Sequence, residues 1–277
     1  MRSLKFLGLT TLVSLSAIMS NPCAAAAGPY DGKTLNIAVN AIYPPLEYHD
    51  PASNALMGFD IDLGNALAHE LGAKIVWQES AFAQLMPSLA SQRADLVLSG
   101  LNDRVDRRTS ADFVDYLNSG AQMFVAKADP VTDMTQLCGK RIAMSRSTSF
   151  PASTTGWSDI HCVQAGHPAM IIVGAEDSAA ARMDLRQQRV DAVVQGSETI
   201  PYTMQLEPNA YRIVDKPFTV TQQGIAFRKT DTALRAAVAS ALTTLIQNGT
   251  YGQIVDRWHL QSSQAHTVTI NGAALSQ

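Results

Sequence analysis

Along the chain from residue 34, short runs of hydrophobic residues alternate with segments in which hydrophobic residues recur every three or four positions. The short runs are typical of buried strands, and the periodic segments are typical of helices with one apolar face. Phe59, Leu63, Leu67 and Leu71, for example, are spaced four apart. This alternation predicts an α/β fold with largely parallel sheets flanked by helices. In the first part of the chain the predicted strands are residues 34–40, 74–79 and 94–100, and the predicted helices are residues 57–73 and 82–92.

The alternation starts again after about residue 120, and it ends in two helices separated by Asn248 and Gly249. Two α/β lobes joined by crossing strands fit this order, with the crossings expected near residues 122–127 and 220–224. We therefore expect a discontinuous first lobe, residues 28–123 and 223–277, and a second lobe, residues 124–222. The strands predicted here are residues 122–127, 139–147, 190–197 and 222–229, and the helices lie within residues 178–189 and 231–260.

The first 27 residues have a different pattern from the rest. Arg2 and Lys5 precede an apolar run, and small residues follow from Ala24 to Ala27. This order is typical of a secretory signal peptide, and the apolar run is shorter than the roughly 20 residues of a membrane span. Cleavage after these small residues would remove Cys23. A lipid anchor on Cys23 is the weaker alternative, because small apolar residues do not precede it.

Charge and cysteine content narrow the possibilities further. The net charge is −3, and loss of the positive charges of Arg2 and Lys5 would make it −5. No basic run is present, so nucleic acid is not an expected partner. Cys138 and Cys162 would remain after cleavage, and in an oxidising compartment we expect them to form a disulfide, with two buried thiols as the alternative. No cofactor motif occurs, and the histidines lack metal-ligand spacing, so neither a cofactor nor a metal site is expected.

Ligands of open α/β sheets bind beyond the carboxyl ends of the strands. The loops that follow the predicted strands are therefore the candidate site. Tyr43 precedes two prolines that stiffen its loop, and it could present a flat ring to a ligand. Phe82, before a helix, could form the opposite wall, although packing against the core is an alternative for both. The candidate loops are residues 40–48, 99–108, 145–151 and 195–199.

The stretch SGLNDRVDRRTSADFVDY, residues 99–116, places three arginines after a buried strand. Arg107 is the candidate carboxylate anchor, because a guanidinium presents a planar fork that matches two carboxylate oxygens. Arg104 and Arg108 are expected to be solvated or paired with neighbouring aspartates. In the second lobe, residues 147–149 offer hydroxyl and amide donors that could complete an anion site, although such turns also cap helices.

Several motifs occur in the order seen in one family of transport proteins. They are YPPLEY, GFDIDLGNALAHELG, LMPSLASQRADLVLSGLNDRVDRR, FVDYLNSG, LCGKRIAMSRSTS, QRVDAVVQGS and NGTYGQIVDRWHL, and the match covers essentially all of residues 35–260. In these motifs the chain resembles the family 3 extracellular solute-binding proteins of amino-acid ABC transporters.

The resemblance implies the two-lobed type II periplasmic binding protein fold, with a small-molecule ligand between the lobes. It further implies a monomer in the periplasm that closes on an amino acid or related carboxylate, delivers it to a membrane permease and makes or breaks no bond. By position, Tyr43 and Phe82 match aromatic walls and Arg107 matches the carboxylate-binding arginine. The other ligand-binding residues implied are Ser99, Gly100 and Asn102 in the first lobe and Thr148 and Ser149 in the second.

Two positions depart from the family pattern. Gly196 stands where the family usually has an aspartate that pairs with the ligand's α-ammonium group. Glu198, Gln195 or Asp191 could replace it, with Asp191 expected to be structural instead. Asn102 stands where threonine or serine is common. The alternatives are a periplasmic dehydratase of the cyclohexadienyl type, for which Glu198 would supply the acid, and a receptor that signals to a membrane sensor.

Overall fold

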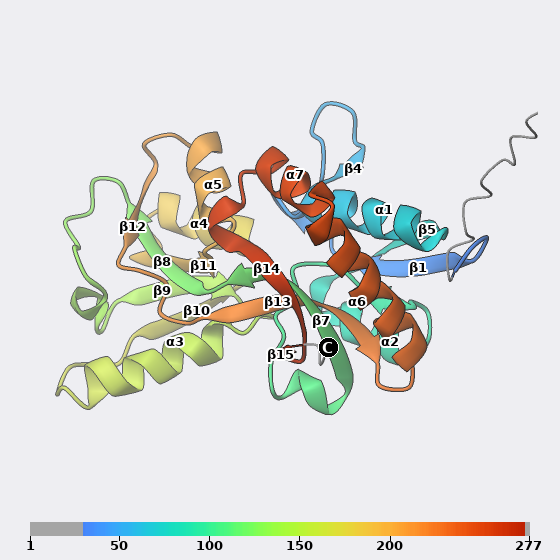
Figure 1. Ribbon diagram of the computed structural model, residues 1–277. Coiled ribbons are helices and arrows are strands. Elements are labelled where there is room, and N and C mark those ends of the chain that lie inside the picture. The colour runs from blue at the N-terminus through green and yellow to red at the C-terminus, as the bar shows by residue number, and fades with distance from the viewer. Residues whose placement is uncertain (1–29, 275–277) are drawn as a thin grey trace, which may run out of the picture.

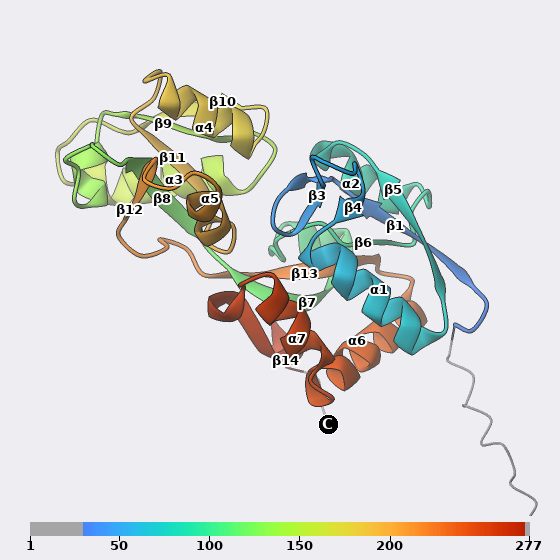
Figure 2. The ribbon, with the colours of Figure 1, turned by 90° about the horizontal axis from the view of Figure 1, so that it is seen from above.

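The computed structural model describes residues 30–274 and divides them between two α/β lobes (Figures 1 and 2). The first lobe is built on a seven-stranded sheet and the second on a five-stranded sheet. The predicted signal peptide, residues 1–27, lies outside the described residues, as does Cys23. Within residues 30–274, none of the helices has the length and apolar character needed to cross a membrane. A separate three-stranded sheet consists of β2 (Ile42–Tyr43), β3 (Glu47–His49) and β4 (Leu56–Met57).

The sheet of the first lobe has the strand order β15-β14-β7-β13-β6-β1-β5. β1 is parallel to β5 and β6, whereas β13 is antiparallel to β6 and β7, and β14 is antiparallel to β7 and β15. The sheet is therefore mixed, and the prediction of a mainly parallel sheet was wrong in this detail. The strands are β1 (Thr34–Val39), β5 (Lys74–Glu79), β6 (Leu96–Val97), β7 (Ala111–Ser119), β13 (Thr221–Arg228), β14 (Gln264–Ile270) and β15 (Ala273–Ala274).

The sheet of the second lobe has the order β10-β9-β11-β8-β12 and is mixed as well. β9 is parallel to β10 and β11, and β8 is antiparallel to β11 and β12. The antiparallel pairing of β7 with β13 has a simple cause: the chain leaves the first lobe along β7 and returns to it along β13, so these strands run in opposite directions. The strands are β8 (Ala121–Ala126), β9 (Arg141–Ser145), β10 (Ile171–Ala175), β11 (Ala192–Gly196) and β12 (Tyr211–Val214).

Two segments connect the lobes, and both are visible in Figure 2. One is Gly120 between β7 and β8, and the other lies between β12 and β13. A Cβ atom at Gly120 would lie 2.2 Å from the carbonyl oxygen of Thr219, so the two connections touch where only glycine fits. Residues 121–123 pair within the second sheet and residues 221–222 within the first, which places each crossing a few residues before the predicted boundary.

Helices cover both faces of the first sheet. Successive strand residues point to opposite faces, and on each face the apolar ones pack against helices. Ile37 packs in the cluster that contains α1, α6 and α7, whereas Ala38 packs in the cluster that contains α2. The four predicted helix-face residues of α1 are all buried, and Gly72 adopts the left-handed conformation (φ 72°) that ends the helix. The helices are α1 (Phe59–Leu71), α2 (Leu85–Ala90), α6 (Thr232–Gln247) and α7 (Thr250–Arg257).

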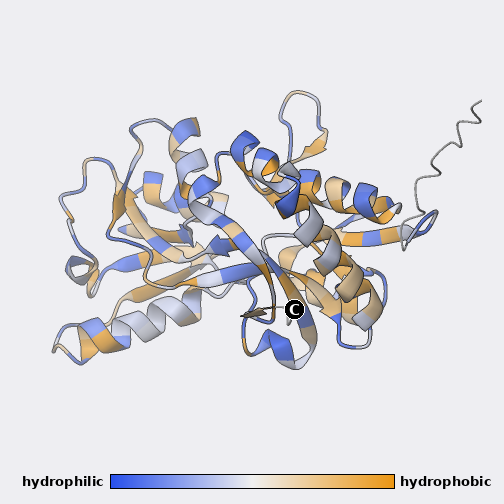
Figure 3. Cartoon of the chain, viewed as in Figure 1, coloured by the Kyte–Doolittle hydropathy of each residue, from blue (hydrophilic) through white to orange (hydrophobic). Residues whose placement is uncertain are grey.

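The second sheet is covered in the same way, and the hydrophobic residues gather on the strands and on the helix faces that meet them (Figure 3). α4 (Ser178–Arg186) and α5 (Ile200–Leu206) contribute to the core on one face. α3 (Phe150–Ser158) contributes to the core on the other face. The predicted disulfide is confirmed: it joins Cys138 and Cys162, whose Cα atoms are 5.6 Å apart, beside the end of α3.

Candidate functional site

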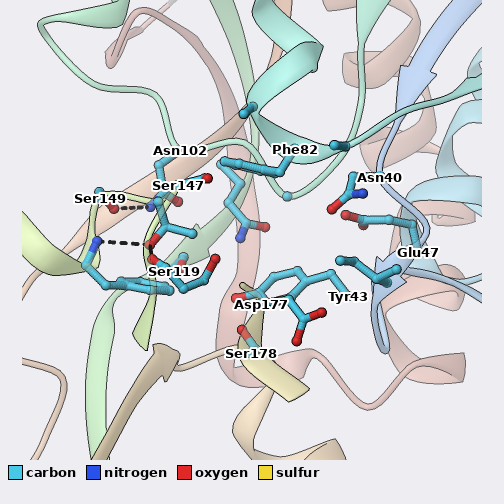
Figure 4. A pocket seen from close by; sticks show the side chains of 18 of the residues that line it. Asn40, Tyr43, Glu47, Phe82, Asn102, Ser119, Ser147, Ser149, Asp177 and Ser178 are labelled. Atoms are coloured by element: carbon cyan, nitrogen blue, oxygen red, sulfur yellow. Dashed lines mark hydrogen bonds between the residues drawn. The ribbon is translucent and has the colours of Figure 1, made fainter. Parts of the chain in front are cut away.

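A cavity of ≈ 130 Å³ lies between the two lobes and is lined by residues of both. The loops that line it follow the carboxyl ends of β1, β5, β6, β9, β10 and β11, as expected for α/β sheets. Figure 4 shows Phe82 and Tyr43 on opposite sides of this space. Of the residues predicted from the sequence, Tyr43, Phe82, Gly100, Asn102, Arg107, Thr148, Ser149 and Glu198 line the cavity.

Arg107 lies in a short 3₁₀ turn, Arg107–Thr109, and extends into the cavity. Its Nη1 donates a hydrogen bond of 2.9 Å to the carbonyl oxygen of Asn102, and its guanidinium carbon lies 5.9 Å from the centre of the Phe82 ring. Among the described residues, no carboxylate lies within 4.0 Å of this guanidinium. Burial lowers the pKa of Arg107, with the nearby Arg104 charge adding to the effect. The site therefore holds a partly desolvated cation that can accept an anionic group.

The two neighbouring arginines are paired, as the sequence suggested. Arg104 donates to Asp106 at 2.8 and 3.1 Å, at the surface of the loop. Arg108 donates to both oxygens of the buried Asp103, at 2.6 and 2.8 Å. The charges around Arg107 therefore neutralise one another and leave its guanidinium free for the cavity.

Asn102 bridges the two lobes. Its Nδ2 donates to the Oγ of Ser149 at 3.1 Å, and Ser149 is the N-cap residue of α3. Thr148 donates to the carbonyl oxygen of Ser145 at 2.8 Å, which fixes the turn before the helix. Asn102 therefore uses the longer reach of its side chain to contact the second lobe across the cavity.

Glu198 enters the cavity from the turn between β11 and α5, and it is 1% exposed. Its Oε1 accepts hydrogen bonds from the hydroxyl of Tyr43 (3.1 Å) and from Nε2 of Gln223 (2.8 Å), and its Oε2 accepts one from Ser119 (2.5 Å). Burial raises the pKa of Glu198, while these three donors act in the opposite direction by stabilising the carboxylate. Glu198 follows a strand of the second lobe, whereas all three donors lie outside the second sheet. The acid of one lobe is therefore held by residues of the first lobe and the crossing strands.

Gly196 explains how Glu198 reaches this position. A Cβ atom on residue 196 would lie 2.1 Å from Oε1 of Glu198 and 2.5 Å from the hydroxyl of Tyr43. The carboxylate of Glu198 thus occupies space that a side chain at position 196 would need. Glu198 can therefore hold its carboxylate in this position only because residue 196 is a glycine.

Three predicted site residues do not line the cavity. Gly196 is buried beneath Glu198, and Gln195 accepts from Arg182 and donates to Thr199, away from the cavity. Ser99 is fully buried, accepts from the amide of Asn40 and donates to Glu47 at 2.9 Å. Each belongs to a layer that supports the lining residues. The side chain of Asp191 accepts from the amide of Arg141, which agrees with a structural role.

Several acidic and polar residues line the cavity without having been singled out from the sequence. Glu47 lies on the first-lobe side, and Glu176 and Asp177 lie on the second-lobe side. Glu176 and Asp177 directly follow β10, which was not predicted as a strand. Had it been predicted, these two residues would have been candidates, because ligands bind beyond the carboxyl ends of strands. Glu47 lies in a candidate loop, but its burial below Ser99 has no signature in the sequence. Ser119 and Gln223, which hold Glu198, come from the two crossing strands.

The charges of the cavity are arranged asymmetrically. Arg107, with Asn102 and the start of α3, forms a positive side. Four acidic side chains line the rest, namely those of Glu47, Glu176, Asp177 and Glu198. Such a site can hold a small molecule that carries an anionic group at one end and cationic groups elsewhere.

Residues 35–261 match the family model of the bacterial extracellular solute-binding proteins, family 3. The L-arginine-binding protein of Pseudomonas aeruginosa is 30% identical over 268 residues, which cover 93% of this chain and 96% of the relative. The ABC transporter arginine-binding protein 1 of Escherichia coli is 29% identical over 238 residues, covering 84% and 94% of the two chains. A solved structure of an ancestral arginine-binding protein bound to arginine has a TM-score of 0.72 at 28% identity, covering 81% of this chain and 97% of that one.

These similarities extend over both lobes and the connections between them, and they confirm the two-lobed fold of a periplasmic binding protein. The relatives are binding proteins by name, and they give no support to a dehydratase. The chain belongs to the bacterial extracellular solute-binding proteins of family 3.

Proposed function

We propose that the protein binds an amino acid with a positively charged side chain between its lobes and delivers it to the permease of an ABC importer. The observation that carries the proposal is the charge pattern of the cavity. The guanidinium of Arg107 has no carboxylate partner among the described residues, and the cavity is also lined by the acids Glu198, Asp177 and Glu176, the last of which pairs with Arg146. The solute is bound and released unchanged. The names of the relatives, which include arginine-binding proteins of Pseudomonas aeruginosa and Escherichia coli, support this class of ligand.

In the proposed complex the α-carboxylate of the ligand lies against Arg107. The guanidinium uses Nη1 for the carbonyl of Asn102 and keeps its other donors for two carboxylate oxygens. Gly100, Thr148 and Ser149 lie beside this position and offer backbone and hydroxyl contacts from both lobes. The ring of Phe82, beneath the guanidinium, limits the access of water.

The α-ammonium group is assigned to Glu198. This acid fills the space above Gly196, so it supplies a carboxylate where the family usually has an aspartate side chain. Tyr43 and Gln223 fix its orientation in advance, which lowers the entropic cost of ordering it on binding. On the second-lobe side, Asp177 and Glu176 are placed to attract the charged end of the ligand side chain, and Glu176 also pairs with Arg146.

The proposal also places the protein outside the cytoplasm as a monomer, exported by a signal peptide within residues 1–27. A permease is the proposed partner rather than a membrane sensor, because the arginine-binding relative of Escherichia coli is named as an ABC transporter protein. Transfer to a permease requires release of the ligand, and release follows from opening of the lobes.

The test is a thermal-shift screen of the standard amino acids, ornithine and small amines against the mature protein. A ligand that binds the folded state raises the melting temperature by mass action. We expect L-arginine, L-lysine or L-ornithine to give the largest shift and amines without a carboxylate to give little. The Arg107→Ala variant should lose about 2–5 kcal/mol of binding free energy for the best ligand in calorimetry.

Arg104→Ala is the matched control, because its guanidinium pairs with Asp106 at the surface. It should bind like the unmodified protein. The Glu198→Gln variant tests the amine contact, and we expect it to weaken binding of an amino acid. A protein in which Arg104→Ala abolishes binding while Arg107→Ala does not would show that the anchor is wrongly assigned. If only uncharged amino acids bind, the proposed ligand class is wrong.

A further inference from the structure

We propose that the C-terminal strand β14 and the turn after it position the loop that carries Arg107, and so determine how tightly a carboxylate is held in the cavity. This inference rests on the function proposed above, in which Arg107 binds the ligand. It assigns a role to a segment that lies beyond the family match, which ends at residue 261, whereas β14 begins at Gln264.

β14 lies along the outer side of β7, and Figure 1 shows the two strands next to each other. β7 begins at Ala111, two residues after the 3₁₀ turn Arg107–Thr109. Contacts made by the end of β14 therefore reach the base of the Arg107 loop. They are concentrated at Thr269, Asn271 and Gly272.

The first set of contacts centres on Asp115 of β7, which is fully buried. Its Oδ2 accepts a hydrogen bond from the hydroxyl of Thr269 (2.5 Å) and one from the amide of Gly272 (3.0 Å). Its Oδ1 has no hydrogen-bond partner among the described residues. Burial raises the pKa of Asp115 to about 7, and the nearby charge of Asp103 contributes to this increase.

The second set reaches the Arg107 loop itself. Asp103, next to Asp115, is paired through both oxygens with Arg108, the residue after Arg107. Gly272 (φ +73°) lies against the same guanidinium, since a Cβ atom there would be 2.8 Å from Nη2 of Arg108. The turn after β14 thus covers the ion pair that fixes the shape of the loop.

A third set anchors the start of β7. The side chain of Asn271 accepts from the amide of Phe113 and donates to Asp112, both at 2.9 Å, and its amide donates to the carbonyl of Phe113 at 3.0 Å. Phe113 is buried in the cluster that also contains Leu101, at the start of the Arg107 loop. The C-terminal segment therefore holds the end of the loop directly, and its start only through the packing of Phe113.

Arg107 depends on this support because its own side chain is held weakly. The hydrogen bond to the carbonyl of Asn102 is made within the same loop, so it moves with the loop and does not fix the guanidinium relative to the first sheet. The geometry of a bidentate contact is sensitive to small displacements of the guanidinium. β14 therefore acts as a positioning element, and Thr269 is its most testable residue.

The test compares Thr269→Val with Thr267→Val. Thr267 lies on the same strand and is exposed, so the control makes the identical substitution without removing the contact to Asp115. In the ligand-free protein, amide hydrogen exchange in residues 103–110 should be faster in Thr269→Val than in Thr267→Val. In titrations with L-arginine, Thr269→Val should bind about fivefold more weakly, and Thr269→Ser should restore the affinity.

A double-mutant cycle separates positioning from general destabilisation. In an Arg107→Ala background, Thr269→Val should cause no further loss of affinity, because the group it positions is gone. Equal exchange rates in the two threonine variants would overturn the inference whatever the ligand is. So would a loss of affinity that persists without Arg107. If none of L-arginine, L-lysine and L-ornithine binds the unmodified protein, the proposed function fails, and the exchange comparison still decides whether β14 supports the loop.

Discussion

At the scale of single residues, Glu47 and Asp60 form an unusual pair beneath Gly100. Asp60 accepts from the amide of Gly100 and from Tyr116, and Glu47 accepts from Ser99. Glu47 Oε2 and Asp60 Oδ1 are buried and have no donor among the described residues. Burial raises the pKa of Glu47 well above its usual range, with the Asp60 charge as the next cause, and it raises the pKa of Asp60 to about 7. A proton shared between the two acids would satisfy both oxygens.

This pair predicts that stability falls as pH rises. A carboxyl group whose pKa is raised by folding binds more protons in the folded state, so the folded state is favoured at low pH and loses this advantage as pH rises toward the folded pKa. For Asp60 this window runs from about 4 to about 7. Asp60→Asn keeps the shape of the side chain and removes one charge. Its free energy of unfolding should therefore depend less on pH between 4 and 7, by about 1 to 3 kcal/mol over that range.

Urea unfolding at several pH values measures this effect. Glu70→Gln, an exposed acid on the same helix, is the control and should keep the pH dependence of the unmodified protein. If Asp60→Asn and the unmodified protein have parallel pH profiles, the two buried acids do not share a proton in the way described.

The sequence predicted some residues of the site better than others. Arg107 was chosen because its position matches the carboxylate-binding arginine of the family, and the structure agrees with the expectation that Arg104 and Arg108 pair with aspartates. Ser99 and Gln195 could not be separated from true lining residues. Both lie at the ends of strands that point to the cavity, and whether a side chain faces the cavity or the layer below depends on backbone details that the sequence pattern does not contain.

At the scale of secondary structure, elements with a clear pattern of hydrophobic residues were predicted, and elements whose hydrophobic residues are interrupted by polar ones were not. The strand of residues 74–79 coincides with β5, and the two closing helices separate at Asn248 and Gly249 as expected. β7 was not identified, because three acidic or amide side chains, Asp112, Asp115 and Asn118, interrupt its apolar residues. β14 was not identified either, because it contains few apolar residues. One of its polar side chains, that of Thr269, instead donates a hydrogen bond to Asp115 of β7.

The disulfide between Cys138 and Cys162 belongs to this scale, because it connects the 3₁₀ turn Met134–Leu137 to the end of α3. Reduction should lower the melting temperature. Opening a loop of 24 residues removes about 3 kcal/mol of stabilisation, or about 6–12 °C for a protein of this size. Calorimetry with and without reductant measures the shift, and the Cys138→Ser/Cys162→Ser variant should not respond. Finding two free thiols in unfolded, non-reduced protein would contradict the pairing.

At the scale of the whole molecule, the lobes touch through a few polar contacts. Tyr43 binds Glu198, Asn102 binds Ser149, and the hydroxyl of Tyr202 donates to that of Tyr48 at 3.2 Å. A ligand that contacts both lobes adds to these bonds and favours the closed arrangement. Solution scattering should therefore show a smaller radius of gyration with a saturating amino-acid ligand. Arg107→Ala at the same ligand concentration should show no change, and an unchanged radius in the unmodified protein at saturation would argue against lobe closure.

The path of the chain through the lobes also has a consequence for folding. The core of the second lobe is built from one continuous segment, from Ala121 to Val214. The core of the first lobe combines Leu35 with Leu242 and Val268, near the other end of the chain. During synthesis the second lobe can fold as soon as its own residues have emerged, whereas the first must wait for α6, α7 and β14. The apolar strands of the N-terminal half are thus the part of the nascent chain that stays exposed longest, and the part that chaperones most need to protect.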